Sequence, residues 1–420
     1  MKLIATGDWH IGNLFHGNDR LPEHKHFFDW LLEQIREHQP EALLVAGDVF
    51  DTANPSAAAQ EIYYKFIADA TQMAPEMKII ISAGNHDSAL RLEAPRALLS
   101  QHNVEIRGNV TRKYVAHEDG NKWVTEFDEL IIPLTGKDGV KMAILVVPFL
   151  RSDKVDGSCY SKSVNDFLKA LTKRGRGLYP DHQLVMMAHM YAKGAEIADK
   201  DASEKIMIGG QEEVNLEGWN DHPHYFTSGH IHKRQHIWNT DWARYSGSVL
   251  PMSFAEKGYQ HGVDLVTFSN THKPKSEFLE YFPQHELKVL PENEEGCTIP
   301  ELKKLIKNLP PRGVDGKLTD KFMYLLLKVK QDKVNNDEIK ELDSLLEKKD
   351  VVLCKIHRIV PMVDISALTT PNKITNIEDI LARDPLDTLK ETFIIMHKKE
   401  MSPHQEEMLE NLLKSLNEEE

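Results

Sequence analysis

Seven side chains of metal-binding type follow five short apolar runs in the first part of the chain. Each run has the composition of a buried β-strand, and the polar residues come directly after it. The seven are Asp8, His10, Asp48, Asn85, His189, His230 and His232. Carboxylate oxygens are hard ligands and imidazole nitrogens are borderline ones, a mixture that suits manganese, iron or zinc. Two such metals sharing a carboxylate would activate water and neutralise a phosphate, so the pattern predicts phosphoryl chemistry.

Taken singly, each cluster is weak evidence, because a turn or a helix cap explains it equally well. The chain contains three His-x-His triplets, which begin at His24, His222 and His230. Only the third follows an apolar run and a glycine, and we interpret the first two as surface residues. The informative property is the order of all five clusters, each after a strand. In open α/β sheets, the carboxyl ends of the strands are where ligands bind.

Two further residues are candidates for the chemistry itself. His86 follows Asn85 directly and is a candidate acid for protonating the leaving group. Asp51 lies three residues after Asp48 and could hold the His86 imidazole in the right orientation. The alternative is that Asp51 only shapes the pocket for the phosphate.

The elements that must position these residues alternate between strands and helices up to about residue 270. The runs that predict strands are 2–6, 42–46, 78–82, 104–107, 112–116, 122–132, 141–147 and 183–188. The patterns that predict helices are 23–38, 56–73, 94–100 and 163–174. Four later runs predict a second, antiparallel set of strands, at 224–227, 235–238, 243–246 and 262–268. Two strand sets with helices outside them predict a layered α/β sandwich.

The sequence changes in character after Pro283. Helices at 300–308 and 336–348 and strands at 321–330 and 351–359 predict a small α+β unit. A third region, 376–418, has apolar stripes and charged faces that predict helices. The segment 193–215, rich in Ala, Asp, Glu and Gly, is expected to be a loop near the site.

Composition narrows the class of protein. A chain of 420 residues with 41% hydrophobic and 28% charged residues is expected to fold into two or three domains. Its three cysteines show no paired spacing, which is typical of a reducing cytosol. The sequence shows no signal peptide, and its longest apolar stretch, 142–150, is too short to cross a bilayer. We therefore expect a cytoplasmic protein without a membrane partner.

The net charge of −14 is unusual for a protein that handles nucleic acid, but it is unevenly distributed. Residues 377–420 contain five Lys or Arg and twelve Asp or Glu, which is half of the net charge. Basic stretches occur elsewhere, at 169–176 and 303–307, and such stretches can hold phosphates on an acidic protein. The alternative is that they are ordinary solvated helix faces.

The motifs together resemble those of the calcineurin-like metallophosphoesterases over about 270 residues. The resemblance implies a four-layer α/β/β/α sandwich with two divalent metals. One metal would be held by Asp8, His10, Asp48 and His232. The other would be held by Asp48, Asn85, His189 and His230. Asp48 would bridge the two ions, and His86 would be the catalytic histidine.

Within these phosphoesterases, segments 47–51, 83–88 and 245–254 are similar to the SbcD family of bacterial nuclease subunits. That resemblance implies a phosphoesterase (nuclease) domain at 1–280, a small α+β capping domain at 285–360 that contacts DNA, and a C-terminal helical segment at 376–420. The last segment would dock on SbcC, an ATPase related to SMC proteins. The chain has no G-x-x-x-x-G-K-[ST] motif, so any ATP-driven step must come from such a partner.

The same resemblance implies an enzyme that cuts DNA with Mn²⁺, although Mg²⁺, Fe²⁺ or Zn²⁺ would fit the ligands too. Its expected activities are an exonuclease on double-stranded ends and an endonuclease on single strands or hairpins. Its expected assembly is a homodimer within a heterotetramer, bound to the nucleoid when on DNA. The alternatives are a phosphomonoesterase or protein phosphatase on the same fold, a DNA-end tether, and a scaffold without activity.

Overall fold

The fold is described from a computed structural model of the chain. The structure describes residues 1–115, 122–151, 159–197, 213–216, 219–237, 240–330 and 336–359, together with 390, 405, 406 and 409. Met1–Arg358 forms one compact unit and Ile359–Glu420 a second. The helical segment expected at 376–420 lies almost wholly outside the described residues, and the loop expected at 193–215 lies largely outside them.

The first sheet has six strands in the order β16-β15-β1-β4-β5-β6. Their bounds are β1 (Lys2–Thr6), β4 (Ala42–Ala46), β5 (Lys78–Ser82), β6 (Val104–Arg107), β15 (His261–Thr267) and β16 (Lys275–Tyr281). The strands β1, β4, β5 and β6 are parallel, whereas β15 runs antiparallel to β1. The expectation that 262–268 belongs to a second strand set is therefore wrong, because this strand pairs with the first strand of the chain.

The second sheet has the order β13-β14-β12-β11-β10-β9. Its strands are β9 (Ile131–Thr135), β10 (Lys141–Val147), β11 (Gln183–His189), β12 (Tyr225–Gly229), β13 (Gln235–His236) and β14 (Ala243–Tyr245). Because β10, β11, β12 and β14 are parallel, the expected antiparallel set is wrong here too. The single strand expected at 122–132 is broken into β8 (Lys122–Thr125), the 3-10 helix η2 (Phe127–Leu130) and the start of β9, and β8 pairs with β7 (Arg112–Val115).

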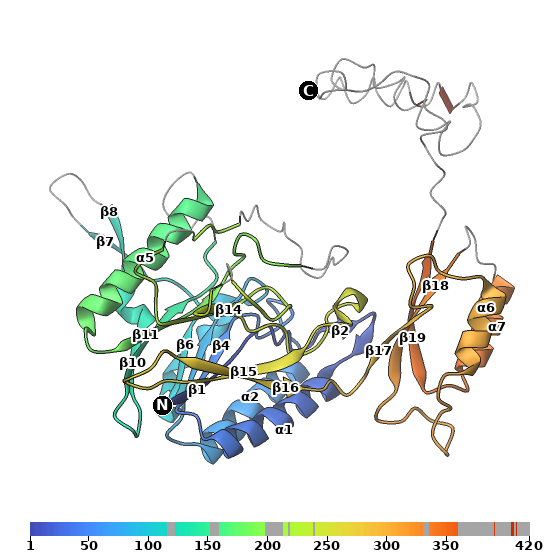
Figure 1. Ribbon diagram of the computed structural model, residues 1–420, viewed down its shortest axis with the longest axis horizontal. Coiled ribbons are helices and arrows are strands. Elements are labelled where there is room, and N and C mark those ends of the chain that lie inside the picture. The colour runs from blue at the N-terminus through green and yellow to red at the C-terminus, as the bar shows by residue number, and fades with distance from the viewer. Residues whose placement is uncertain are drawn as a thin grey trace. The chain divides into compact units, whose positions relative to one another are not determined.

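The two sheets stack face to face with helices outside them, which makes the four layers α/β/β/α (Figure 1). Helices α1 (Leu21–His38) and α2 (Ala57–Met73) pack on the first sheet, and α5 (Tyr160–Leu178) packs on the second. Side chains alternate along each strand, so β4 turns Leu43 and Val45 toward the helices and Leu44 toward the other sheet. Strands buried on both faces are continuously apolar for this reason.

Three short helical pieces follow β5. They are α3 (Ala89–Glu93), α4 (Arg96–Leu99) and the 3-10 helix η1 (Ser100–His102). The single helix expected at 94–100 is thus divided, and Pro95 stands immediately before α4. Proline cannot donate the backbone hydrogen bond that would continue α3.

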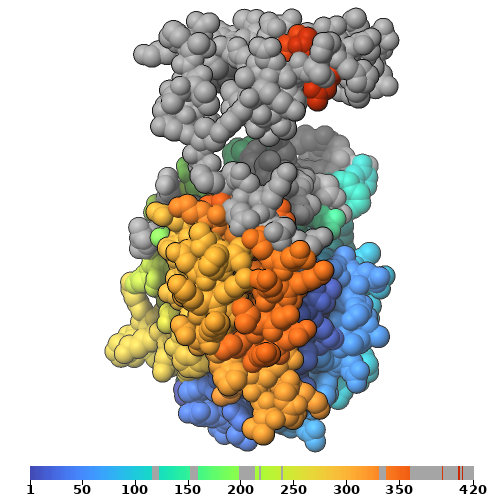
Figure 2. Space-filling view, turned by 90° about the vertical axis from the view of Figure 1, so that its right-hand side faces the viewer, coloured from blue at the N-terminus to red at the C-terminus, as the bar shows by residue number. Residues whose placement is uncertain are grey.

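A third sheet of three parallel strands follows the sandwich. Its elements are β17 (Leu287–Leu290), α6 (Ile299–Lys307), β18 (Met323–Val329), α7 (Asn336–Leu346) and β19 (Val351–Arg358). Figure 2 shows these residues as the orange surface that faces the viewer. Leu302, Ile306, Leu325 and Leu342 form a separate hydrophobic core for this sheet and its two helices. At the start of α6, Thr298 and Glu301 form a reciprocal capping box.

The third sheet is joined to the sandwich through a buried ion pair. Arg20 precedes α1 and binds Glu23 by two hydrogen bonds of 2.7 and 2.9 Å. The Tyr324 hydroxyl on β18 donates to Glu23 Oε2 at 3.1 Å. Phe15, in the hairpin of β2 (Leu14–Phe15) and β3 (Asn18–Asp19), packs with Leu287 and Tyr324 beside this pair.

The helices of the fold are those of a protein core. Among the residues that the structure describes, no helix is both long and apolar enough to cross a bilayer.

Candidate metal centre

Five strand ends meet at one edge of the sandwich. Asp8, Asp48 and Asn85 follow the parallel strands β1, β4 and β5 of the first sheet. His189 ends β11 of the second sheet, and His230 follows β12 there. The two groups are in contact, since the His230 backbone N–H donates to Asp8 Oδ1 at 2.8 Å. The candidate residues therefore come from both sheets.

The loops after β1 and β4 run side by side and hold three candidate ligands in an unusual backbone conformation. The N–H of Asp8 donates to the carbonyl of Gly47 at 3.1 Å, and that of His10 donates to the carbonyl of Asp48 at 2.9 Å. Asp8, His10 and Asp48 have φ angles of 50°, 45° and 47°. This left-handed region costs energy for residues with a side chain, and strain of this kind collects at functional sites.

Glycines allow the loops to approach this closely. A Cβ on Gly84 would lie 2.1 Å from Asp48 Oδ1, and one on Gly229 would lie 2.1 Å from the carbonyl oxygen of Ala46. Neither distance is possible for real atoms. Glycine at these two positions is therefore required for the Asp48 side chain and the two sheet edges to meet.

Asp48 lies at the middle of the cluster. Its Oδ2 is 3.6 Å from His10 Nε2 and 3.3 Å from His189 Nε2, and its Oδ1 accepts the His86 backbone N–H at 2.9 Å. Burial acts to raise the pKa of Asp48, but His189 and His10 outweigh burial and hold this pKa well below its usual range. Burial acts to lower the pKa of His189, and Asp48 outweighs it and raises this pKa to about 9.

Asn85 joins two histidines of the second sheet. Its Oδ1 is 2.9 Å from His189 Nε2 and 2.9 Å from His230 Nδ1. Burial, followed by the neighbouring His189, lowers the pKa of His230 to about 3. A neutral imidazole is the form that binds a metal.

The buried polar atoms of the cluster fit a metal centre. Asp8 Oδ2 and both ring nitrogens of His10 are buried without a hydrogen-bond partner. Such atoms are costly unless something compensates them. Ligand atoms of Asp8, Asp48 and His189 lie within 4.8 Å of one another, as do those of His10, Asp48 and His86. Asp48 is common to both groups, and the donor set of carboxylate and imidazole suits divalent transition metals.

The surroundings of His86 differ from the expectation. Its Nδ1 lies 2.8 Å from the main-chain carbonyl oxygen of Asp51, and this carbonyl can only accept a hydrogen bond. The Asp51 carboxylate instead accepts from Asn13 Nδ2 at 3.0 Å and lies 3.4 Å from His10 Nδ1. The hypothesis that the Asp51 side chain orients His86 is therefore wrong, because the backbone of the same residue makes this contact.

Sequence reasoning missed three buried residues that support the centre. Glu256, in the 3-10 helix η4 (Phe254–Glu256), contacts His232 Nδ1 at 2.9 Å. Asp87 accepts the backbone N–H groups of Val49, Phe50 and Gly84, and so ties the loop after β4 to the loop after β5. Asp87 stands inside the motif 84–87, where its position was visible. Glu256 had no signal in the sequence.

His24 is the third, and its assignment to the surface is wrong. The side chain is fully buried, with its ring nitrogens 2.9 Å from the Arg20 carbonyl and 2.8 Å from the Trp9 carbonyl. Trp9 stands between the candidate ligands Asp8 and His10, so His24 supports the loop that carries them. Its partner in the triplet, His26, is exposed, as expected.

The expected phosphate-holding stretch at 169–176 lies on α5. Two of its arginines are engaged in ion pairs, Arg174 with Asp128 at 2.6 Å and Arg176 with Asp221 at 2.8 Å. Paired arginines favour the alternative of a solvated helix face for this stretch.

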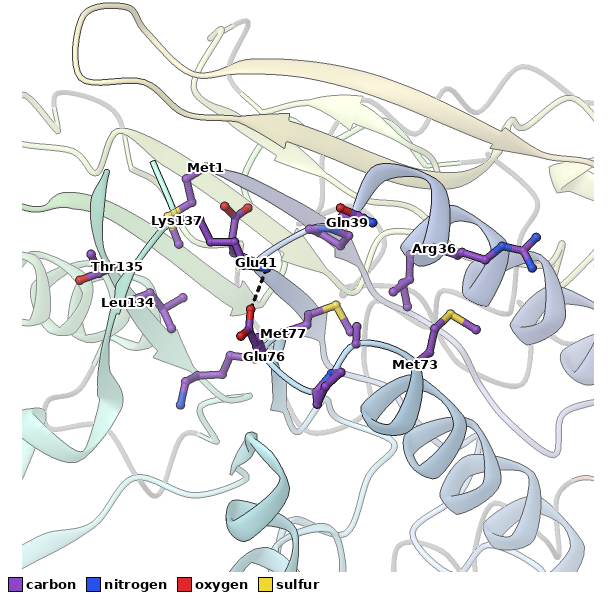
Figure 3. A pocket seen from close by; sticks show the side chains of 15 residues that line it. Met1, Arg36, Gln39, Glu41, Met73, Glu76, Met77, Leu134, Thr135 and Lys137 are labelled. Carbon is purple, nitrogen blue, oxygen red and sulfur yellow. Dashed lines mark ion pairs between the residues drawn. The ribbon is translucent and has the colours of Figure 1, made fainter. Parts of the chain in front are cut away.

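A separate pocket lies at the opposite edge of the first sheet. It has a volume of about 540 Å³ and is lined where the strands begin, by residues that include Met1, Glu41, Met73 and Met77 (Figure 3). An exposed ion pair between Lys137 and Glu76 spans 2.7 Å there. None of the candidate ligands lines this pocket.

Comparison with known proteins agrees with this geometry. Residues 1–274 match the family model described as calcineurin-like phosphoesterase. This match covers more than half of the chain, which therefore belongs to the calcineurin-like phosphoesterase family of metal-dependent hydrolases.

Three relatives have names that make them the SbcD component of the nuclease SbcCD. The protein of Rhodobacter capsulatus is 32% identical over 286 residues, which is 66% of this chain and 68% of the relative. That of Escherichia coli (strain K12) is 31% identical over 284 residues, 64% and 66% of the two chains. That of Bacillus subtilis is 29% identical over 277 residues, 63% and 66%. Within its family, the chain is thus a DNA nuclease subunit of the SbcD type, matched over about two thirds of each relative's length.

Proposed function

We propose that this protein hydrolyses phosphodiester bonds of DNA with two divalent metal ions, Mn²⁺ in the cell. The substrates are double-stranded ends, cut as an exonuclease, and single strands or hairpins, cut as an endonuclease. One observation carries the proposal: ligand-type side chains of both sheets converge on the two oxygens of Asp48. A carboxylate in that position can bridge two cations.

The proposed ligand sets share this carboxylate. The first set is Asp8, His10, Asp48 and His232. The second set is Asp48, Asn85, His189 and His230. The buried and unpartnered atoms of Asp8 and His10 support the first set, and the short contacts of Asn85 Oδ1 with His189 and His230 support the second.

His86 is the proposed acid of the reaction. When bound, the two cations supply activated water and neutralise the charge that builds up on the phosphate. The chain itself must then protonate the leaving oxygen. Donation from His86 Nδ1–H to the Asp51 carbonyl fixes the ring, so that Nε2 is the nitrogen left to transfer a proton.

The proposed partners follow from the relatives, whose names contain SbcCD. We propose that residues 1–280 form the nuclease domain, 285–360 a capping domain on DNA, and 376–420 the segment that binds an SbcC-type ATPase. The complex would act in DNA repair, recombination and replication in the cytoplasm, on the nucleoid. A homodimer within a heterotetramer is the proposed assembly, and the exposed Leu90 and Leu98 of α3 and α4 are apolar surface on which it could form.

The test compares two substrates and one variant. The full chain is loaded with Mn²⁺ and assayed on linear duplex and hairpin DNA and on a phosphomonoester. We expect cleavage of DNA, and we expect His86→Ala to retain the bound Mn²⁺ while its turnover falls about 10²- to 10⁴-fold. Loss of metal together with activity in this variant would show that His86 is a ligand. Preference for the phosphomonoester would favour a phosphatase instead.

A further inference from the structure

Glu256 is a buried carboxylate on a segment that contributes no metal ligand. It lies at the end of η4 and is fully buried. Its Oε2 accepts the backbone N–H of Met252 at 2.8 Å, and its Oε1 lies 2.9 Å from His232 Nδ1. Burying a carboxylate is expensive, so its contacts with other groups require an explanation.

The histidines of the centre are oriented in different ways. His86 Nδ1 and His189 Nδ1 each lie against a main-chain carbonyl oxygen, of Asp51 and Ala46 respectively. His232 Nδ1 lies against a carboxylate. An ionised carboxylate can only accept, so His232 donates through Nδ1 and keeps Nε2 for a metal. The negative charge also makes the imidazole more basic and therefore a stronger ligand, which a carbonyl does less well.

The position of the His232 ring indicates which ion this contact affects. The ring lies beside that of His10, with 5.2 Å between the centroids. His189 and His230 form a different neighbouring pair, with centroids 5.3 Å apart. The contact with His232 therefore places Glu256 on the half of the centre that contains His10.

We propose that Glu256 is a positioning residue that fixes the tautomer and orientation of His232 and thereby sets the affinity of one of the two metal sites. The proposal rests on the ligand assignment given above. Its consequence is selective: loss of the carboxylate weakens the site of Asp8, His10, Asp48 and His232. The site of Asn85, His189 and His230 keeps its ion.

The test measures metal binding by the full chain, independently of cleavage. The metal-free wild type and Glu256→Gln are titrated with Mn²⁺ by equilibrium dialysis, and the bound ions are examined by electron paramagnetic resonance. The wild type is expected to bind two ions whose spins are coupled. In Glu256→Gln, one site is expected to weaken about 10- to 100-fold, and the remaining ion is expected to give the spectrum of an isolated Mn²⁺.

Two further variants separate positioning from a general loss of structure. Ser253→Ala removes the side-chain cap of η4, in which Ser253 Oγ accepts the Ala255 N–H at 3.1 Å, and does not alter Glu256. It is expected to bind both ions normally. Glu256→Asp keeps the buried charge on a shorter side chain, which secures folding if Glu256→Gln unfolds, and is expected to weaken the same single site.

The outcomes are distinguishable. Two coupled ions of wild-type affinity in both Glu256 variants would overturn the role of Glu256 and leave the metal assignment intact. An equal loss in Ser253→Ala would overturn it as well, because order in η4 would then be the cause. A wild type that binds no Mn²⁺ would overturn the proposed function and this inference with it.

Discussion

The two oxygens of Asp48 have different neighbours, and this difference organises the centre at the scale of single residues. Oδ1 accepts the His86 N–H, while Oδ2 faces the rings of His10 and His189. The backbone of Asp48 is left-handed, and Gly84 packs directly against its carboxylate. Geometry of this kind leaves little room for adjustment, because protein interiors are close-packed.

Gly84→Ala tests how rigid this packing is. The new Cβ would lie 2.1 Å from Asp48 Oδ1 and 2.3 Å from Asp48 N, so the Asp48 loop must move. We expect the free energy of unfolding to fall by about 1–3 kcal/mol, as for other overpacked sites, and Mn²⁺ affinity to fall with it. Chemical denaturation and Mn²⁺ titration measure the two effects.

The matched control is Gly177→Ala on α5. A Cβ at Gly177 meets nothing within 4 Å, and alanine is the better helix former. The unfolding free energy should stay constant or rise by up to about 1 kcal/mol, with Mn²⁺ affinity unchanged. Wild-type Mn²⁺ affinity in Gly84→Ala would show that the loop adapts, contrary to our argument.

Among the secondary-structure elements, the contact between α1 and the third sheet depends on a charge pair removed from water. Arg20 and Glu23 are both buried, and Tyr324 on β18 donates to the same carboxylate. Burial acts to raise the pKa of Glu23, and the hydrogen bonds from Arg20 outweigh it and lower this pKa. A buried pair of this type is costly to break from one side, because the remaining charge is left without a partner.

Glu23→Gln is expected to lower the unfolding free energy by about 3–5 kcal/mol, since Arg20 would keep its charge in the same buried place. The pH dependence has a defined sign. The pKa of Glu23 in the folded protein lies below its ordinary value of 4.5, so its contribution to stability is complete above that pH and is lost as the pH falls further. Urea denaturation at neutral pH and in mild acid measures both effects.

The control for this variant is Asp69→Asn, which removes an exposed ion pair with Lys65 on α2. Exposed pairs contribute at most about 1 kcal/mol, so a small change is expected. A Glu23→Gln chain as stable as Asp69→Asn would show that the pair does not hold the third sheet in place.

The elements that sequence predicted best are the buried strands. The runs 2–6, 42–46, 78–82 and 141–147 match β1, β4, β5 and β10 to the residue, because strands covered on both faces are continuously apolar. The run of β16 (Lys275–Tyr281) was missed, since its exposed residues interrupt the apolar pattern of an edge strand. Which sheet a strand joins depends on contacts distant in sequence, and so β15 was misassigned.

The candidate site divides in the same way. Residues that follow a strand in a recognisable motif were found, and the structure brings Asp8, Asp48, Asn85 and His189 together. The residues that orient them were not found. Glu256 lies in a 3-10 turn that is adjacent to His232 only in the folded chain, and the main-chain carbonyl of Asp51 has no sequence identity that a motif could show.

For the whole molecule, the compact unit Met1–Arg358 contains every proposed ligand. Deletion of residues 376–420 is therefore expected to leave the thermal unfolding midpoint and the Mn²⁺-dependent hydrolysis of a small phosphodiester unchanged. The same deletion is expected to abolish binding of an SbcC-type ATPase, which co-purification measures. Retained ATPase binding would place the partner surface within the first 375 residues, against our proposal.

The pairing of β1 with β15 has a consequence for synthesis. Lys2 pairs with Thr267, and the Asp8 carboxylate accepts the N–H of His230, so the first strand must wait for residues made much later. Closing so long a loop is slow, and contacts of this range form late in folding. A growing chain on the ribosome thus carries Asp8, His10 and Asp48 without their partners from the second sheet. The enzyme is born inert, and the ability to cut DNA arises only when the sandwich closes.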